Sequence, residues 1–305
     1  SYPVIVDEQG NETQNFVKPL DTSEVEGKFN DLRTTLNCKS GKKVNIYHNA
    51  IDQNVGEKEY PSVYSVCDGV VSKVTNMTNY NRQIARLARL LRAELFVLRP
   101  NGETDAKAAG FPLVARMMYN KSKKNPKWKM KARRALNKII KNPNWSDLRY
   151  NIQKGLGLKW GTISGMIRYY KKNKILPWFP IGGVAITITS NPDHTGRKWK
   201  FYYSHLEEVK VKQGQAIKAG DVIATAGASS IADSKPHLHL EAWFAAGTSR
   251  KGLPKSKIRR KTNFQCVRGS LAIDPTILIP ELGEAHAGAY ANTIKKQKDY
   301  IEKKH

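Results

Sequence analysis

The sequence predicts a mainly β protein with an antiparallel sheet or barrel-like core and a large α-helical insertion, so that the chain as a whole is α+β. Three observations support this fold class. Short runs rich in β-branched residues, with glycines at the turns, occupy residues 41–75 and 182–280. Residues 76–181 instead have apolar residues at helical spacing. Finally, 305 residues with 40% hydrophobic content suffice for one large core or two modest domains.

The order of these patterns predicts four parts. They are an N-terminal extension, a discontinuous core, a basic helical insertion and a polar, lysine-rich helical tail, which cover residues 1–40, 41–75 with 182–280, 76–181 and 281–305. In the extension, Asp21 or Ser23 suits a helix cap, and acidic residues follow, which predicts a short helix through about Arg33. Such a helix would pack against the core or contact a partner.

The first half of the core begins with a strand that runs into a turn over residues 43–52. This stretch places His48 and Asp52 four residues apart, and such a pair taken alone is most often structural. A β-branched stretch follows over residues 64–75, where an Asp-Gly pair predicts a turn between two strands.

The insertion reads as a set of helices. Its clearest apolar stripe, with arginines between the members, consists of Ile84, Leu87, Ala88, Leu91 and Leu95. Further helices are predicted at residues 111–120, 128–141, 145–154 and 162–172.

Most of the excess charge belongs to the insertion. Residues 76–181 hold 24 Lys and Arg against 4 Asp and Glu, a net +20 of the chain's +26. This charge favours anionic wall polymers, nucleic acid or acidic lipid as partners, but a helical bundle with a solvated basic face explains it equally well. Nucleic acid is the weaker choice, because Trp128, Trp145 and Trp160 are placed as helix anchors and no nucleic-acid-binding motif is present.

Strands return in the second half of the core. They are predicted near residues 182–189, 198–206 and 209–227, with glycines at the turns. His205 would end the second of these strands, and on its own it reads as a surface or core histidine.

Two histidines separated by one residue form the clearest local signal of chemistry. In a strand, His237 and His239 would point to the same side, which is a metal-ligand geometry, although a solvated strand face is the alternative.

The cysteines and the apolar runs of the sequence limit the possible disulfides and membrane spans. Cys38, Cys67 and Cys266 are an odd number and far apart, which favours buried thiols over a disulfide or a ligand role. No apolar run is long enough for a membrane span, and Ser1 does not open a secretory signal.

Several motifs recur together in a fixed order. They are His48-x-x-x-Asp52, Tyr203-Ser-His205-Leu, the glycine-containing segment 214–227, His237-Leu-His239-Leu-Glu241, and Asp274-Pro275. Together they resemble the lysostaphin-like, or LytM-type, zinc metallopeptidases that cut peptidoglycan peptides. The resemblance covers residues 41–75 and 182–280, and it departs from the family at Ala50, where Gly is usual.

This resemblance implies the roles of the site residues. His48, Asp52 and His239 would hold Zn²⁺ and leave one coordination position open, while His205 and His237 would be catalytic. Which of the two acts as general base stays open. Glu241 would orient a histidine, or else form an ion pair at the end of the strand.

The implied function is a zinc-dependent endopeptidase that hydrolyses peptide stems or cross-bridges of bacterial peptidoglycan. The insertion, residues 76–181, would hold it to anionic wall polymers. A chain without an export signal suggests a phage product carried in the virion or tail, or released at lysis; a secreted bacterial enzyme is the alternative. A second hypothesis is a degenerate metallopeptidase fold that serves as a structural or polyanion-binding module in a larger virion assembly.

Overall fold

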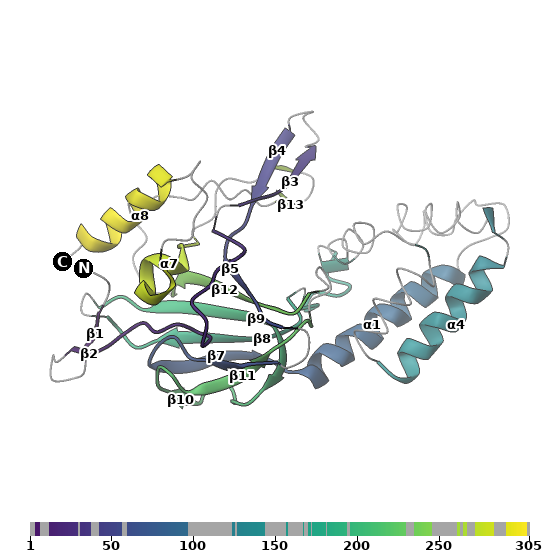
Figure 1. Ribbon diagram of the computed structural model, residues 1–305. Coiled ribbons are helices and arrows are strands. Elements are labelled where there is room, and N and C mark those ends of the chain that lie inside the picture. Colours follow the sequence, from purple (N-terminus) through teal and green to yellow (C-terminus); the bar gives the residue numbers. More distant parts are fainter. Residues whose placement is uncertain are drawn as a thin grey trace. The chain divides into compact units, whose positions relative to one another are not determined.

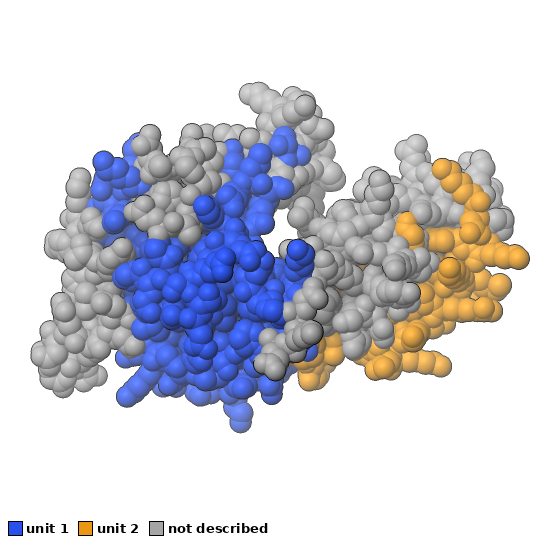
Figure 2. All heavy atoms as spheres, in the orientation of Figure 1, with its two compact units in different colours: residues 1–76, 183–305 blue, residues 77–182 orange. Residues whose placement is uncertain are grey.

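Figure 1 shows the computed structural model of the protein. The structure describes residues 4–6, 12–29, 31–37, 43–56, 60–96, 124–125, 127–143, 157, 167, 170–171, 173–180, 182–193, 196–229, 235–245, 261–262, 265–266, 272–283 and 291–303. The chain forms two compact units, residues 1–76 with 183–305 and residues 77–182 (Figure 2). The four-part division predicted from the sequence stays a prediction.

The first unit is built on an eight-stranded antiparallel sheet. Its strands are β5 (Ile51–Asn54), β6 (Ser62–Tyr64), β7 (Gly69–Thr75), β8 (Val184–Ser190), β9 (Trp199–Val209), β10 (Ala216–Ile217), β11 (Val222–Ala226) and β12 (His237–Phe244). They run in the order β10-β7-β8-β9-β11-β6, with β12 beside β9 and β5 beside β12. Over the described residues the sheet is open rather than closed into a barrel. The predicted mainly β class is confirmed.

Strand β9 is the branch point of this sheet. Along one edge it pairs with β8, while its other edge pairs first with β12, from Trp199 to Ser204, and then with β11, from Leu206 to Val209. His205 lies between these two pairings, inside the strand rather than at its end as predicted. The branch brings the ends of three strands together at one place.

Alternation along β12 separates a core face from a site face. The even-numbered positions from Leu238 to Phe244 are at most 1% exposed, as period-2 alternation requires of a strand with one buried face. Behind them, Trp199 stacks on Phe244 with ring centroids 4.6 Å apart, and Phe16 of the N-terminal extension lies 6.3 Å from Trp199. Burial of each large aromatic stabilises the fold by about 1.5–3 kcal/mol, so the histidines stand on a rigid platform.

The C-terminal tail is tied to this unit. Helix α8 (Ala291–Lys303) buries Ile301, and the Gln297 side chain donates a hydrogen bond to the Ala272 carbonyl at 3.1 Å. The Arg197 guanidinium donates to the Ile301 carbonyl, also at 3.1 Å. Within the predicted tail, residues 291–303 form this helix, and these buried contacts bind it to the core more closely than the loosely attached helix that its polar composition suggests.

Smaller elements flank the sheet. They are the paired strands β1 (Val4–Val6) with β2 (Glu12–Asn15), β3 (Leu32–Asn37) with β4 (Lys43–Tyr47) and β13 (Lys261–Thr262) with β14 (Gln265–Cys266), the short helix α7 (Pro275–Leu278) and the 3-10 helix η2 (Pro280–Leu282). Asp274 caps α7 by accepting from the Thr276 amide.

The helix predicted from Asp21 to Arg33 is wrong. The described residues there form an irregular segment that runs beside β5, and β3 begins at Leu32. The Glu26 and Gly27 amides donate to the Asp52 carbonyl at 3.0 and 3.1 Å, and the Asp52 amide donates to the Gly27 carbonyl at 2.8 Å. Backbone groups committed to a neighbouring strand cannot also form a helix.

The second unit contains α1 (Met77–Phe96) and α4 (Trp128–Lys141). Four of the five predicted stripe residues are buried, and the side chain of the fifth, Leu95, lies outside the described residues. Arg92 donates to the Asn137 side chain at 2.9 Å between the two helices. The helix predicted at 128–141 is confirmed. The helices predicted at 111–120 and 145–154, and most of the one at 162–172, lie outside the described residues.

Two composition-based expectations concern the described chain. None of its helices has the length and apolarity that a membrane crossing needs. Cys67 is a free, fully buried thiol as predicted, and burial raises its pKa. Cys38 and the side chain of Cys266 lie outside the described residues.

Candidate functional site

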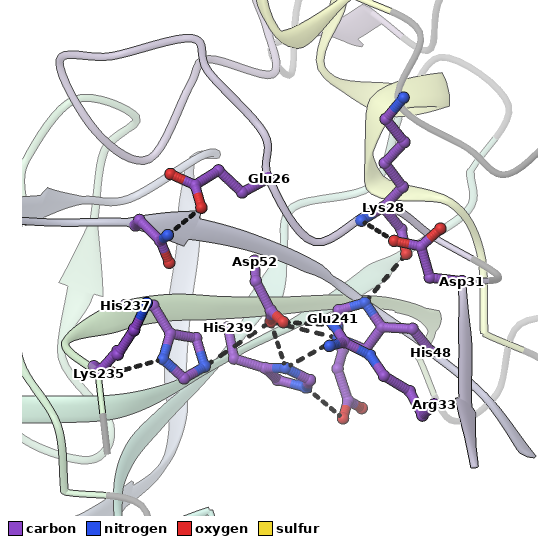
Figure 3. A network of polar contacts seen from close by, with 11 residues as sticks. Glu26, Lys28, Asp31, Arg33, His48, Asp52, Lys235, His237, His239 and Glu241 are labelled. Atoms are coloured by element: carbon purple, nitrogen blue, oxygen red, sulfur yellow. Dashed lines mark hydrogen bonds and ion pairs between the residues drawn. The ribbon is translucent and has the colours of Figure 1, made fainter. Parts of the chain in front are cut away.

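Strand pairing places Asp52 and His239 directly opposite each other. β5 and β12 are antiparallel, and their Cα partners include Asp52 with His239 and Asn54 with His237. Opposite side chains on paired strands share a face, and so do residues two apart on one strand. The same-face prediction for His237 and His239 therefore holds, and Figure 3 shows both side chains directed at Asp52.

Three donor atoms converge in front of β12. Asp52 Oδ1 lies 2.9 Å from His239 Nδ1 and 3.2 Å from His48 Nε2, and these two nitrogens are 3.3 Å apart. Tetrahedral zinc with bonds of about 2.0–2.1 Å holds its ligand atoms about 3.3 Å from one another. His48, Asp52 and His239 thus form a group that could hold a metal ion, and their spacing fits zinc.

The outer nitrogen of His48 is fixed by the N-terminal extension. Its Nδ1 lies 3.0 Å from the Lys28 carbonyl, which can only accept a hydrogen bond. Nδ1 therefore carries the proton, and Nε2 presents its lone pair to Asp52 and His239. A backbone carbonyl behind a histidine in this way is typical of metal ligands. Ala50, nearby and fully buried, has no positive φ, so the turn does not require the Gly that is usual in the family.

His239 is held from behind by a carboxylate. Its Nε2 donates to Glu241 Oε1 at 3.2 Å, while the Trp243 indole donates to Glu241 Oε2 at 2.6 Å. Both oxygens of Glu241 are thereby engaged on the same face of β12. Glu241 orients His239 so that Nδ1 faces the site, which is the first of the two roles expected for it.

His237 also directs its Nε2 nitrogen toward the site. Its Nδ1 donates to the Lys235 carbonyl at 2.8 Å, and its Nε2 lies 3.9 Å from Asp52 Oδ1. In the neutral ring Nε2 is then unprotonated, which suits a proton acceptor.

His205 reaches the same face through a β-bulge. Ser204 pairs with Ala185 and Leu206 with Val184, so His205 is the extra residue, and its φ of 65° is left-handed. Bulges re-aim side chains next to functional sites, and a left-handed histidine carries backbone strain. Its ring centroid lies 4.6 Å from that of His237 and 5.3 Å from that of His239. All five predicted site residues thus lie close together.

Sequence reasoning missed one charged group at this place. Arg33 Nη2 donates to Asp52 Oδ2 at 2.5 Å, from strand β3 of the extension. Nothing in the local sequence marks this arginine, since its contact depends on how the extension runs beside β5.

The local charges shift the pKa values of the three donors. Burial alone would raise the pKa of Asp52, but the hydrogen bond from His239 and the neighbouring histidine charge outweigh it and hold that pKa well below its usual range. Burial tends to lower the pKa of His239, yet Asp52 and Glu241 raise it to about 9. Burial lowers the pKa of His48. Without metal, His239 therefore carries the one extra proton of this group.

The three residues His48, Asp52 and His239 are called the donor group below. The fold and the donor group together define a β-sheet protein whose histidine and aspartate cluster could hold a metal ion. A sequence model described as Peptidase family M23 matches residues 178–251, which include His205, His237 and His239. The comparison with curated proteins found no match. This match confirms the resemblance drawn from the motifs: residues 178–251 are similar to Peptidase family M23.

Three solved structures illustrate the similarity. A zinc containing peptidase from Vibrio cholerae is 17% identical, with 86% of this chain and 42% of that chain covered and a TM-score of 0.36. The antimicrobial peptidase lysostaphin from Staphylococcus simulans is 13% identical, with 92% and 59% covered and a TM-score of 0.38. Its catalytic domain alone is 13% identical, with 85% and 91% covered and a TM-score of 0.34. The family assignment rests on the sequence match and the motifs.

Proposed function

We propose that the protein is a zinc-dependent endopeptidase that hydrolyses peptide stems or cross-bridges of bacterial peptidoglycan. The observation that carries this proposal is the convergence of His48, Asp52 and His239 at tetrahedral spacing, with two further histidines beside them. The substrate class follows from the resemblance to lysostaphin-like enzymes.

In this proposal His48, Asp52 and His239 hold the metal. The Lys28 carbonyl and Glu241 support it by turning one nitrogen of each histidine inward. When bound, zinc supplies Lewis-acid polarisation of a carbonyl and a lowered pKa for water. Three protein donors leave room for substrate, as a catalytic zinc site needs.

His237 and His205 divide the proton chemistry. His237 is the general base, because the Lys235 carbonyl occupies its Nδ1 proton and leaves Nε2 free to accept another. His205, next to it, in its protonated form donates a hydrogen bond to the developing oxyanion or a proton to the leaving amine. Both rings act from the face that carries the donor group.

The helical insertion supplies a surface for anionic wall polymers. On α4 the side chains of Lys131, Arg134, Lys138 and Lys141 are exposed. A cationic helix face attracts polyanions through long-range electrostatics that salt screens. The phage context and the action outside the cell remain predictions.

Digestion of purified walls tests the proposed activity. We expect the zinc-loaded protein to release peptides with new amino termini, detectable by mass spectrometry, from walls of at least one chemotype. His205→Ala and His237→Ala should retain zinc and lose about 10²- to 10⁴-fold in rate. A zinc-loaded protein that cuts no wall chemotype would contradict the proposal and favour a structural module with a degenerate site.

A further inference from the structure

The two carboxylate oxygens of Asp52 have different surroundings. Oδ1 faces the nitrogens of His239 and His48 at 2.9 and 3.2 Å. Oδ2 instead accepts from Arg33 Nη2 at 2.5 Å. Figure 3 shows Arg33 on the side of the cluster opposite His237. Only Oδ1 is therefore presented to a metal at the donor group.

We propose that Arg33 is a positioning residue that makes Asp52 a one-oxygen ligand of the metal. The proposal rests on the proposed function, because it assumes that the donor group binds metal. A carboxylate can bind a metal through one oxygen or both, and a charge-assisted hydrogen bond to a guanidinium holds one oxygen in place. With Oδ2 held, the second oxygen cannot take the position that substrate needs.

The chain around Arg33 is built for this contact. A Cβ on Gly27 would lie 2.6 Å from Asp52 Oδ2 and 2.9 Å from Arg33 Nη2, so only glycine lets the two groups meet there. The backbone of the same segment reaches both ligands of the first half of the core, since Gly27 bonds to the Asp52 backbone and Lys28 to His48 Nδ1. Residues outside the M23-matched range thus complete the candidate metal site.

The exposure of the pair suits a geometric role better than a stabilising one. The Arg33 side chain is 43% exposed, whereas the Asp52 side chain is 13% exposed. A half-exposed ion pair adds little to stability because water screens it. Its fixed hydrogen-bond direction persists regardless, which is what orientation of Oδ2 requires.

Cobalt(II) loaded into the full chain in place of zinc tests the proposal. Four-coordinate cobalt absorbs visible light more strongly than cobalt with additional ligand atoms, so its spectrum reports the coordination number. We expect Arg33→Met to lose visible absorption intensity, because Oδ2 becomes free to join Oδ1 on the metal. Arg33→Lys, which keeps a cationic donor, should restore part of the intensity. Lys73→Met removes one exposed positive charge from β7 and serves as the control.

The outcomes separate this proposal from the proposed function. Equal spectra for the wild type and Arg33→Met, with cobalt bound in both, would overturn the role of Arg33 and leave the metal site standing. A wild-type chain that binds no cobalt and no zinc would overturn the proposed function itself. An equal loss of visible absorption in Lys73→Met and Arg33→Met would show that the effect comes from net charge alone, and would also overturn the proposal.

Discussion

Each histidine of the donor group has one nitrogen held by a partner that fixes where its proton sits. The family resemblance drawn from the motifs predicted all five candidate site residues, because it depends on residue types and their order along the chain. It could not identify Lys28 or Lys235, which act through backbone carbonyls that every residue has. Arg33 was missed for a related reason, since one arginine in a basic chain carries no signal of its own.

Metal binding should release the proton that His239 holds. The pKa of His239 is raised to about 9, so the ring is protonated below that pH and neutral above it, and zinc needs the neutral form. Below pH 8 we expect about one proton to be released per zinc bound, and apparent affinity to rise with pH until about 9. Calorimetry in buffers of different ionisation enthalpy measures this release.

Glu241→Gln provides the matched comparison for proton release. The variant loses a carboxylate that raises the His239 pKa, so fewer protons should be released between pH 7 and 9. Identical release from the variant and the wild type would show that Glu241 does not set the protonation of His239.

Strands and helices were predictable where one periodicity dominated. The stripe in α1 and the alternation in β12 are examples, because each buries one face along its whole length. The helix prediction for the segment before Arg33 was wrong, because its acidic residues resemble a helix start while its backbone forms hydrogen bonds with β5. The bulge at His205 is likewise set by the pairing of three strands, which no local pattern encodes.

The close approach of the extension to β5 predicts that Gly27 tolerates no side chain. In Gly27→Ala the new Cβ would overlap Asp52 and Arg33, which should lower the free energy of unfolding by about 1–3 kcal/mol and weaken zinc binding. Gly56→Ala is the control, because a Cβ there meets nothing within 4 Å. Equal denaturation midpoints and zinc affinities for the two variants would rule out this packing.

Backbone strain at the bulge predicts an inverted order of substitutions. His205 has a left-handed backbone with φ of 65°, which penalises a Cβ. The free energy of unfolding should therefore be about 1 kcal/mol higher for His205→Gly than for His205→Ala. At Lys200, elsewhere on β9 and without positive φ, alanine should be the more stable. Urea denaturation of the four variants measures both orders, and His205→Ala more stable than His205→Gly would refute the strain.

The division of the molecule into two compact units separates the donor group from the bulk of the charge. All five candidate site residues belong to residues 1–76 with 183–305, while a net +20 lies in residues 76–181. Composition revealed that imbalance directly. Of the helices predicted in the insertion, the described residues contain α1 and α4.

Wall retention should depend on the exposed cations of α4. Replacement of Lys131, Arg134 and Lys138 by Gln should weaken binding to purified walls about tenfold, from about 0.5 kcal/mol per exposed charge pair, with a shallower salt dependence. A triple Gln variant at Lys73, Lys210 and Lys212, exposed in the other unit, is the control. Equal retention of both variants in a sedimentation assay would assign binding to net charge alone.

The zinc content of the purified full chain tests the central claim most directly. Elemental analysis should find about one zinc per chain, none in His239→Ala, and a full complement in His205→Ala. That pattern would make His48, Asp52 and His239 the holders of the metal and leave His205 for the reaction. A His239→Ala protein with as much zinc as the wild type would contradict the account.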